Sequence, residues 1–193
     1  PAQNTHINDV LPFHRTNHEQ WVDSMMNTLS LDQKIAQLFM IAANSRESNE
    51  LYYQKIDSLI MHYDLGGVIF FQSGPNELKN LLDRYNSVSN LPLLTSIDAE
   101  WGLGMRLDSV ELFPWMMTLG AIQDDNAIYD FGFEVASQLK ALGVHINFAP
   151  VLDVNNNPNN PIINLRAYSD QPDIVADFGI QFIKGIQDQG LYA

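Results

Sequence analysis

Apolar residues along this chain follow two alternating patterns, short uninterrupted runs and stripes at helical spacing. The short runs predict four strands, at Gln37–Ala42, Gly66–Phe71, Pro92–Ile97 and His145–Pro150, with Val151–Val154 continuing from the last. Because these runs show little alternation with polar residues, they indicate strands whose outer face is covered by helices, as in a parallel sheet.

Stripes of apolar residues at intervals of three and four predict the helices between those strands. The predicted helices cover Trp21–Leu29, Asn49–Tyr63, Pro75–Val88, Asn126–Leu142 and Ile174–Gln189. A capping box at Ser30–Gln33 predicts a short helix through Leu38, and Asp170 and Pro172 predict the cap and first turn of the last helix. This alternation of strand and helix predicts an α/β fold with right-handed crossovers.

Two architectures fit this alternation, an open doubly wound sheet and a (β/α)8 barrel. The nucleotide-binding form of the open sheet requires a G-x-G-x-x-G turn after its first strand, but Ala43–Glu47 contains no glycine. Polar clusters follow the third and fourth strands, which favours a barrel, because barrel active sites collect at the carboxyl ends of the strands. A closed barrel has eight strands and about 250 residues. The 193 residues therefore indicate a partial TIM-type barrel of about four β/α units.

A polar segment opens the chain. Residues 1–17 are expected to be a poorly ordered lead-in. Residues 1–28 then comprise this lead-in and the first helix, and residues 29–193 form the barrel part. The chain begins with Pro1 in place of Met, which together with the polar lead-in favours an exported, processed protein.

Charge and composition limit the classes of molecule that the protein is expected to bind. The formal net charge is −13, from 10 Lys and Arg against 23 Asp and Glu, which argues against nucleic acid and against an anionic membrane surface. An uncharged substrate fits this balance better than an anionic one. No apolar run approaches the ~20 residues of a membrane-spanning helix. The absence of cysteine excludes disulfides, thiolate metal sites and cysteine nucleophiles.

The most informative polar cluster follows the third predicted strand, within Leu93–Leu107. It contains Asp98, Glu100, Trp101 and Arg106. An ionised Asp accepts charge-assisted hydrogen bonds, which suits two neighbouring hydroxyls of a sugar, and an indole offers a flat face to the ring. Two simpler readings stay open, Asp98 as a loop acid and Trp101 as a core anchor.

Two arginines follow strand ends and carry planar donor forks that bridge hydroxyls or orient a carboxylate. The position of Arg166, just before the cap of the last predicted helix, favours a role in ligand binding. Arg106 fits equally well in an ion pair with a nearby acid: Asp98, Glu100 or Asp153. A general acid/base pair needs two carboxylates across one pocket, and Asp98 with Asp153 is the formal candidate.

The histidines do not indicate a metal site. His6, His14 and His18 lie in the polar lead-in, where a solvated role is expected, and His62 is expected at the surface of a helix, so we expect no metal and no cofactor. His145 opens a predicted strand and is expected to be a packed residue.

Five motifs follow one another along the chain: GGVIFF at Gly66–Phe71, SIDAEWGLGMR at Ser96–Arg106, LFPWMMTLGA at Leu112–Ala121, LGVHINFAPVLDV at Leu142–Val154 and NLRAYS at Asn164–Ser169. In this order and spacing, they resemble the amino-terminal half of the catalytic barrel of glycoside hydrolase family 3, from about Leu29 to the end. The pattern is similar to the β-N-acetylglucosaminidase (β-hexosaminidase) branch, which carries D-x-E-G-G where this chain has Asp98–Gly102. Trp101 departs from that pattern.

The resemblance implies a retaining exo-glycosidase that removes terminal β-linked N-acetylglucosamine. By matching position, Asp98, Arg166 and Arg106 would contact the sugar in the non-reducing-end subsite. The family's nucleophilic Asp, its Asp–His acid/base pair and its Lys-His sugar contacts belong to the fifth strand and beyond. None of these is in the sequence, so the chain alone is expected to be inactive.

Other functions stay open beside this one. A β-glucosidase-type member of the same family is the nearest alternative, followed by a non-catalytic carbohydrate-binding or assembly module. A nucleotide or phosphosugar binder is disfavoured by the missing glycine-rich turn. Half a barrel would leave the first and fourth strands as open edges, so we expect the rest of the polypeptide or a second copy to cover them.

Overall fold

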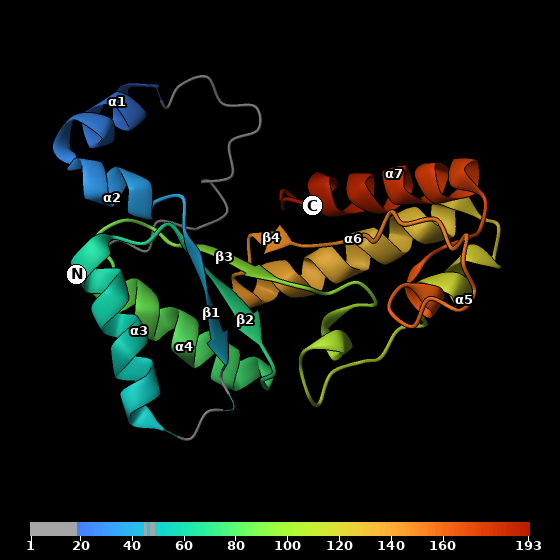
Figure 1. Ribbon diagram of the computed structural model, residues 1–193, viewed down its shortest axis with the longest axis horizontal. Helices are drawn as coiled ribbons and strands as arrows, with labels where there is room; N and C mark the ends of the chain where they lie inside the picture. The colour runs from blue at the N-terminus through green and yellow to red at the C-terminus, as the bar shows by residue number, and fades with distance from the viewer. Residues whose placement is uncertain (1–18, 45, 47–48) are drawn as a thin grey trace.

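Four parallel strands form one sheet, in which the spatial order β1-β2-β3-β4 equals the order along the chain (Figure 1). The computed structural model describes residues 19–44, 46 and 49–193, and the lead-in predicted at 1–17 lies outside them. The strands are β1 Met40–Asn44, β2 Gly67–Phe71, β3 Leu94–Ile97 and β4 Ile146–Asn147. All three pairings are parallel, which confirms the predicted α/β fold. The sequential order fits a barrel, because a doubly wound sheet reverses its order at a switch point.

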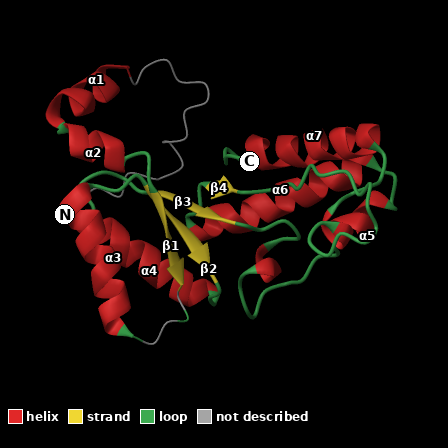
Figure 2. Cartoon of the chain, viewed as in Figure 1, coloured by secondary structure: helices red, strands yellow, loops and turns green. Residues whose placement is uncertain are grey.

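Helices separate the strands, and α6 and α7 lie side by side (Figure 2). The α-helices are α1 Glu19–Thr28, α2 Leu31–Ala36, α3 Glu50–Tyr63, α4 Pro75–Val88, α5 Met116–Gly120, α6 Asp125–Leu142 and α7 Pro172–Asp188. Two 3-10 turns, η3 Leu103–Met105 and η4 Asn164–Arg166, lie in the connections after β3 and β4. No helix in the described ranges is long and apolar enough to cross a membrane.

Local signals in the sequence account for the helix ends. The Ser30 hydroxyl accepts from the Gln33 backbone N–H while the Gln33 side chain accepts from the Ser30 N–H, which is the predicted capping box. The Asn49 side chain caps α3 through the Leu51 N–H. Gly143 ends α6 in the left-handed conformation at φ 82°, where glycine has no steric cost.

Two predicted strands differ from the observed ones. The first was expected at Gln37–Ala42, but Gln37 and Leu38 bond back to Gln33 and Ile35 as the turn that ends α2. The fourth was expected at His145–Pro150, but only Ile146–Asn147 pair in a ladder. Beyond Phe148, the Ala149 N–H turns back to the Asn147 carbonyl, and Pro150 has no N–H to donate.

Smaller differences lie near α7 and after β3. The N-cap of α7 is Gln171, one residue beyond the expected Asp170, with Pro172 in the first turn as predicted. Helix α5 and the turns η3 and η4 were not predicted from the sequence. Each has three to five residues, too short to show a helical repeat.

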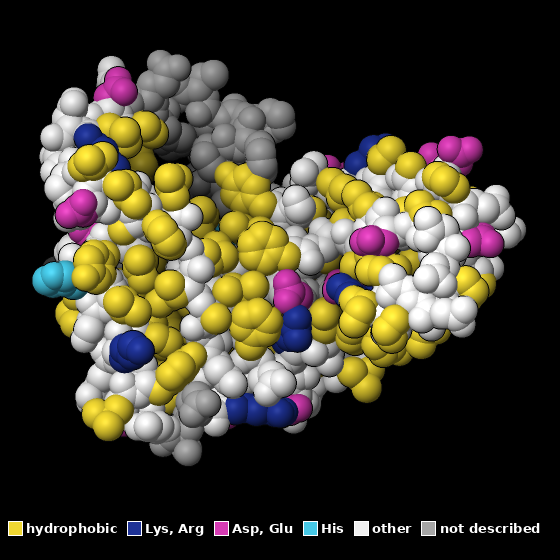
Figure 3. Space-filling model, viewed as in Figure 1, with side chains coloured by type: hydrophobic (Ala, Val, Ile, Leu, Met, Phe, Trp, Pro, Cys, Tyr) yellow, Lys and Arg dark blue, Asp and Glu magenta, His cyan; other side chains and the backbone are white. Residues whose placement is uncertain are grey.

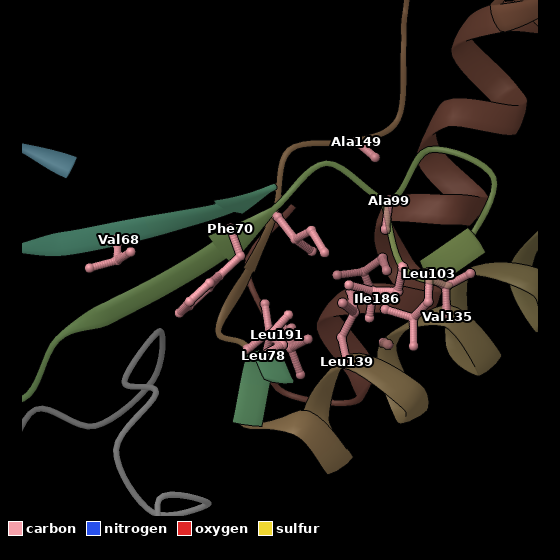
Figure 4. Packing of buried hydrophobic residues seen from close by; sticks show 14 of the residues in the cluster. Val68, Phe70, Leu78, Ala99, Leu103, Val135, Leu139, Ala149, Ile186 and Leu191 are labelled. Atoms are coloured by element: carbon pink, nitrogen blue, oxygen red, sulfur yellow. The ribbon is translucent and has the colours of Figure 1, made fainter. Parts of the chain in front are cut away.

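The hydrophobic core joins the sheet to α4, α6 and α7 (Figure 4). Val68 and Phe70 enter it from β2, and the helices contribute Leu78, Val135, Leu139 and Ile186. Close packing of α6 on α7 depends on glycine, because a Cβ on Gly185 would lie 2.6 Å from the Phe133 backbone nitrogen.

The outer edge of β4 is partly covered, which corrects the expectation of an open fourth strand. Tyr192 bridges to Ile146 in parallel, donating its N–H to the His145 carbonyl and accepting from the Asn147 N–H, both at 2.9 Å. The β1 strand pairs with β2 alone and ends the sheet as described. Hydrophobic side chains gather over the strands and the neighbouring helices on the face shown in Figure 3. Large exposed apolar residues include Leu38, Phe39, Leu94, Phe148 and Leu152.

Candidate functional site

The carboxyl end of β3 and the turn η4 bring together the acids and arginines that the sequence analysis selected. The chain leaves β3 at Ile97 and passes through Asp98, Ala99 and Glu100 into a tight turn at Gly102. Gly102 has φ 83°, and a Cβ there would meet the Phe113 ring. The sharp turn after the two acids therefore requires glycine.

Asp98 and Arg106 form an ion pair through Asp98 Oδ2 and Arg106 Nη2. The Arg106 guanidinium carbon lies 4.8 Å from the ring centre of Phe71, the last residue of β2, in cation–π geometry. The ion-pair reading of Arg106 is thus confirmed. Both side chains keep about a quarter of their surface exposed, at 22% for Asp98 and 24% for Arg106, and among the described residues Asp98 Oδ1 has no donor.

Arg166 forms a two-pronged ion pair with Glu100, a partner that the sequence analysis did not assign. Nε donates to Oε2 at 2.8 Å and Nη2 to Oε1 at 2.6 Å, while Nη1 reaches the Ile162 carbonyl at 3.3 Å. The Glu100 side chain is 4% exposed and that of Arg166 is 30% exposed. The hydrogen bonds that Arg166 donates to Glu100 raise the pKa of Arg166, and the negative charges of Glu100, Asp153 and Asp98 raise it further. The acids following β3 and β4 therefore gather around one guanidinium.

Asn147 in β4 bonds directly to the segment that carries the two acids. Its side chain is fully buried. Oδ1 accepts from the Ala99 N–H at 2.9 Å, and Nδ2 donates to the Ala99 carbonyl at 3.3 Å. Both polar groups of the Ala99 backbone thus bond to one side chain, and the Ala99 carbonyl also accepts from the Gly102 N–H at 3.3 Å.

Two stacked indoles lie next to this segment. The ring centres of Trp101 and Trp115 are 4.0 Å apart with planes inclined by 35°. Trp101 packs against the core, whereas Trp115 is 41% exposed at the start of α5. Helix α5 packs on η4, the turn that holds Arg166. The aromatic pair therefore joins the Glu100 side of the site to the Arg166 side.

The asparagine-rich connection after β4 is ordered by its own side chains. Asn160 Oδ1 accepts from the N–H groups of Ile162 and Ile163, and the Asn155 N–H bonds to the Ser169 carbonyl at 3.0 Å. Asp153 is exposed in this connection and pairs with no described cation. Its charge adds to the field around Arg166, and the proposed Asp98–Asp153 acid/base pair stays a prediction.

His145 is packed, as predicted, at the opposite end of β4 from the acids. Its Nδ1 accepts from the Thr95 N–H at 3.1 Å, and burial lowers the pKa of the imidazole. Across residues 19–44, 46 and 49–193, no three His, Asp or Glu side chains gather in a way that could hold a metal ion.

Two residues of this region were missed from the sequence, Asn147 and Trp115. A signal for Asn147 existed, because a lone amide inside the apolar run HINFAP must find buried hydrogen-bond partners. Trp115 gave a weaker signal, an indole after Phe-Pro with no helical repeat around it.

Comparison with known proteins identifies the family. The sequence profile described as "Glycosyl hydrolase family 3 N terminal domain" matches residues 30–193. The chain is 32% identical over 150 residues to β-hexosaminidase A of Pseudoalteromonas piscicida, covering 71% of this chain and 25% of that protein. It is 26% identical over 173 residues to a β-N-acetylglucosaminidase/β-glucosidase of Cellulomonas fimi, covering 90% of this chain and 30% of that protein.

A solved structure is similar to this chain in fold as well as in sequence. A family 3 β-N-acetylglucosaminidase from Paenibacillus sp. superposes with a TM-score of 0.75 at 37% identity, covering 84% of this chain and 32% of that one. The chain thus spans between a quarter and a third of the length of each of these relatives. The matched profile, the relatives and the similar structure show that the chain belongs to glycosyl hydrolase family 3 and carries its N-terminal domain.

Proposed function

We propose that the complete protein containing this chain is a retaining exo-glycosidase that hydrolyses terminal β-linked N-acetylglucosamine. The observation that carries this proposal is the Asp98 carboxylate, which keeps one oxygen without a described donor beside Arg106 and near Arg166. Such an oxygen accepts hydrogen bonds from sugar hydroxyls, and the charge of the carboxylate strengthens them.

A role is proposed for each of the four site residues, and its contacts support it. Asp98 accepts from the sugar, and Arg106 orients Asp98 through their ion pair. Arg166 is held by Glu100 and directs the remaining edge of its guanidinium at the same sugar. Trp101, stacked on Trp115, supplies an apolar face beside the polar groups. These roles suit an uncharged substrate, in line with the acidic chain.

The reactive groups are proposed to lie in other parts of the complete protein. Retaining hydrolysis needs a carboxylate nucleophile and a second group that donates and then accepts a proton. The resemblance gives neither role to Asp98 or Glu100, whose carboxylates are paired with Arg106 and Arg166. We therefore place residues 29–193 as the sugar-binding half of a barrel, with residues 1–28 as its lead-in and first helix, and expect no hydrolysis by this half alone.

One assay tests the proposed activity and the proposal that the reactive groups lie outside this chain. The complete protein is expected to release nitrophenol from 4-nitrophenyl N-acetyl-β-glucosaminide, and the 193-residue chain is expected to release none above background. Turnover by the chain alone would show that the reactive groups are misplaced. If neither protein turns over but N-acetylglucosamine binds saturably, the non-catalytic carbohydrate-binding module replaces the glycosidase.

A β-glucosidase-type activity is the second candidate. It is favoured by the similarity to the Cellulomonas fimi protein, whose name includes both activities. The discriminating measurement is kcat/KM of the complete protein for 4-nitrophenyl β-glucoside against the N-acetylglucosaminide. A larger value for the glucoside would overturn the preference for N-acetylglucosamine.

A further inference from the structure

The buried side chain of Asn147 is the link between β4 and the backbone that carries Asp98 and Glu100. The β3–β4 ladder ends at the pair Ile97–Asn147, with one more bond from the Phe148 N–H to the Ile97 carbonyl. Beyond that point, the two bonds between Asn147 and Ala99 continue the connection.

The chemistry of this link is specific to an amide. The Ala99 backbone has one donor and one acceptor. The Asn147 side chain has the matching acceptor, Oδ1, and the matching donor, Nδ2. Ala99 is fully buried and lies over the core near Leu103 in Figure 4. The Ala99 carbonyl also accepts from the Gly102 N–H, but an unpaired Ala99 N–H at such a place is costly, so the segment is held in one position.

The position of Ala99 sets the position of both acids. Asp98 and Glu100 flank it in the chain, and their side chains bond to Arg106 and Arg166 respectively. A shift of Ala99 therefore moves the Asp98 carboxylate and the Glu100–Arg166 pair relative to each other.

We propose that Asn147 is a positioning residue that keeps Asp98 and Arg166 at the separation required by the sugar. This inference rests on the proposed function and adds to it a residue with no expected substrate contact. Asn147 acts on the affinity for substrate through the backbone of Ala99.

A purely structural role for Asn147 predicts a different result, and Thr95 provides the matched control. Thr95 is 1% exposed in β3, and its hydroxyl donates to the Gly143 carbonyl at 2.8 Å. Thr95 therefore also joins β3 to the segment that leads from α6 into β4. It does so at the end of the strands away from the acids. Thr95→Val thus removes a comparable buried bond without touching the Asp98–Glu100 segment.

The first test measures KM and the unfolding midpoint of Asn147→Ala and Thr95→Val in the complete protein. Both variants are expected to lower the midpoint, and only Asn147→Ala is expected to raise KM for 4-nitrophenyl N-acetyl-β-glucosaminide, by at least tenfold. An unchanged KM in Asn147→Ala, or an equal rise in Thr95→Val, would overturn the inference.

The second test uses the variant Asn147→Asp and pH. A neutral carboxyl group donates to the Ala99 carbonyl and accepts from its N–H, whereas an ionised one only accepts and faces the carbonyl oxygen. Burial and the neighbouring charges of Asp98 and Glu100 favour the neutral form. The ratio of variant to wild-type KM is therefore expected to be near one at the acidic end of the range and to rise at least tenfold with pH. A ratio that does not vary with pH contradicts the inference.

A third readout needs no substrate and separates this inference from the proposed function. The Ala99 amide hydrogen is expected to exchange with solvent at least tenfold faster in Asn147→Ala than in wild type, with no such change in Thr95→Val. If wild type fails to hydrolyse the substrate, the proposed function falls. An Ala99 exchange rate unaltered by Asn147→Ala would overturn the positioning role by itself.

Discussion

The two carboxylates that follow β3 differ in their freedom to meet a ligand. Glu100 is 4% exposed and gives both oxygens to Arg166. Asp98 is 22% exposed and gives one oxygen to Arg106. Because a carboxylate offers about four acceptor sites, Asp98 retains capacity for hydroxyl groups, whereas Glu100 serves to hold Arg166. Removing the charge of Asp98 should therefore weaken the binding of substrate. Removing the charge of Glu100 should lower the free energy of unfolding.

The variant Asp98→Asn tests the first half of this distinction. Loss of the charge weakens the bonds to sugar hydroxyls, so kcat/KM of the complete protein for the N-acetylglucosaminide is expected to fall about a hundredfold, or about 2.7 kcal/mol. Asp108→Asn is the control, because Asp108 forms an exposed ion pair with Arg46. Equal losses in both variants would remove Asp98 from the site.

The variant Glu100→Gln tests the second half. A neutral amide replaces the buried partner of Arg166, and the free energy of unfolding is expected to fall by about 2 kcal/mol. Urea denaturation measures this change. Glu50→Gln provides the comparison, since Glu50 pairs with Arg84 at an exposed position and should shift the midpoint less. A Glu100→Gln midpoint equal to wild type contradicts the assignment.

At the scale of elements, α6 and α7 approach each other closely at glycines, beside side-chain contacts such as Phe131 with Phe182. A Cβ on Gly185 would meet the backbone of Tyr129 and Phe133, which cannot move without shifting α6. A Cβ on Gly179 in the same helix would meet only the flexible Leu152 side chain. The two glycines of one helix therefore differ in what an added methyl group costs.

This difference gives a paired prediction for Gly185→Ala and Gly179→Ala. Overpacking is expected to lower the free energy of unfolding of Gly185→Ala by about 2 kcal/mol. Gly179→Ala is expected to be neutral or more stable by up to about 1 kcal/mol, because alanine favours helix. Thermal unfolding of both variants measures the outcome, and a stable Gly185→Ala would show that the helices are less closely packed.

The hydrogen bond between Thr95 of β3 and His145, next to β4, also predicts a dependence of stability on pH. Burial lowers the pKa of His145 in the folded protein. As pH falls below about 6.5, the unfolded chain binds the proton first, so the folded state loses stability until pH passes the folded pKa. In His145→Asn, whose side-chain oxygen still accepts from the Thr95 N–H, this part of the loss is expected to disappear between pH 7 and pH 5. An unchanged pH profile of the unfolding midpoint would assign the loss to other groups.

Elements with strong local signals were predicted closely, and those set by distant contacts were not. Helix α4 was predicted with its observed bounds because Pro75 marks its start and its apolar stripe continues to Val88. Strand β4 was overestimated because the run HINFAP continues after the backbone has turned at Ala149. The Glu100–Arg166 pair was missed because 66 positions separate its members and nothing local to either identifies the other.

At the scale of the whole molecule, the sheet is only partly enclosed. The β1 edge and exposed apolar residues such as Phe39 and Phe148 are the surfaces that the remaining polypeptide or a second copy is proposed to cover. Apolar patches of this kind promote association when uncovered.

The isolated chain is accordingly expected to self-associate. Light scattering should give a mass above the 21.8 kDa of one chain. Addition of the separately prepared remainder of the complete protein should replace this species with a defined complex. A monodisperse 21.8 kDa species would count against the partial barrel.

The indole pair has a practical consequence. Only three tryptophans occur in the sequence, and two of them, Trp101 and Trp115, are in contact at 4.0 Å. The third, Trp21, is on α1. In a Trp21→Phe variant of the 193-residue chain, tryptophan fluorescence excited selectively over tyrosine would come from this pair alone. The protein thus carries its own optical reporter, with which occupancy of the neighbouring site can be followed without a label.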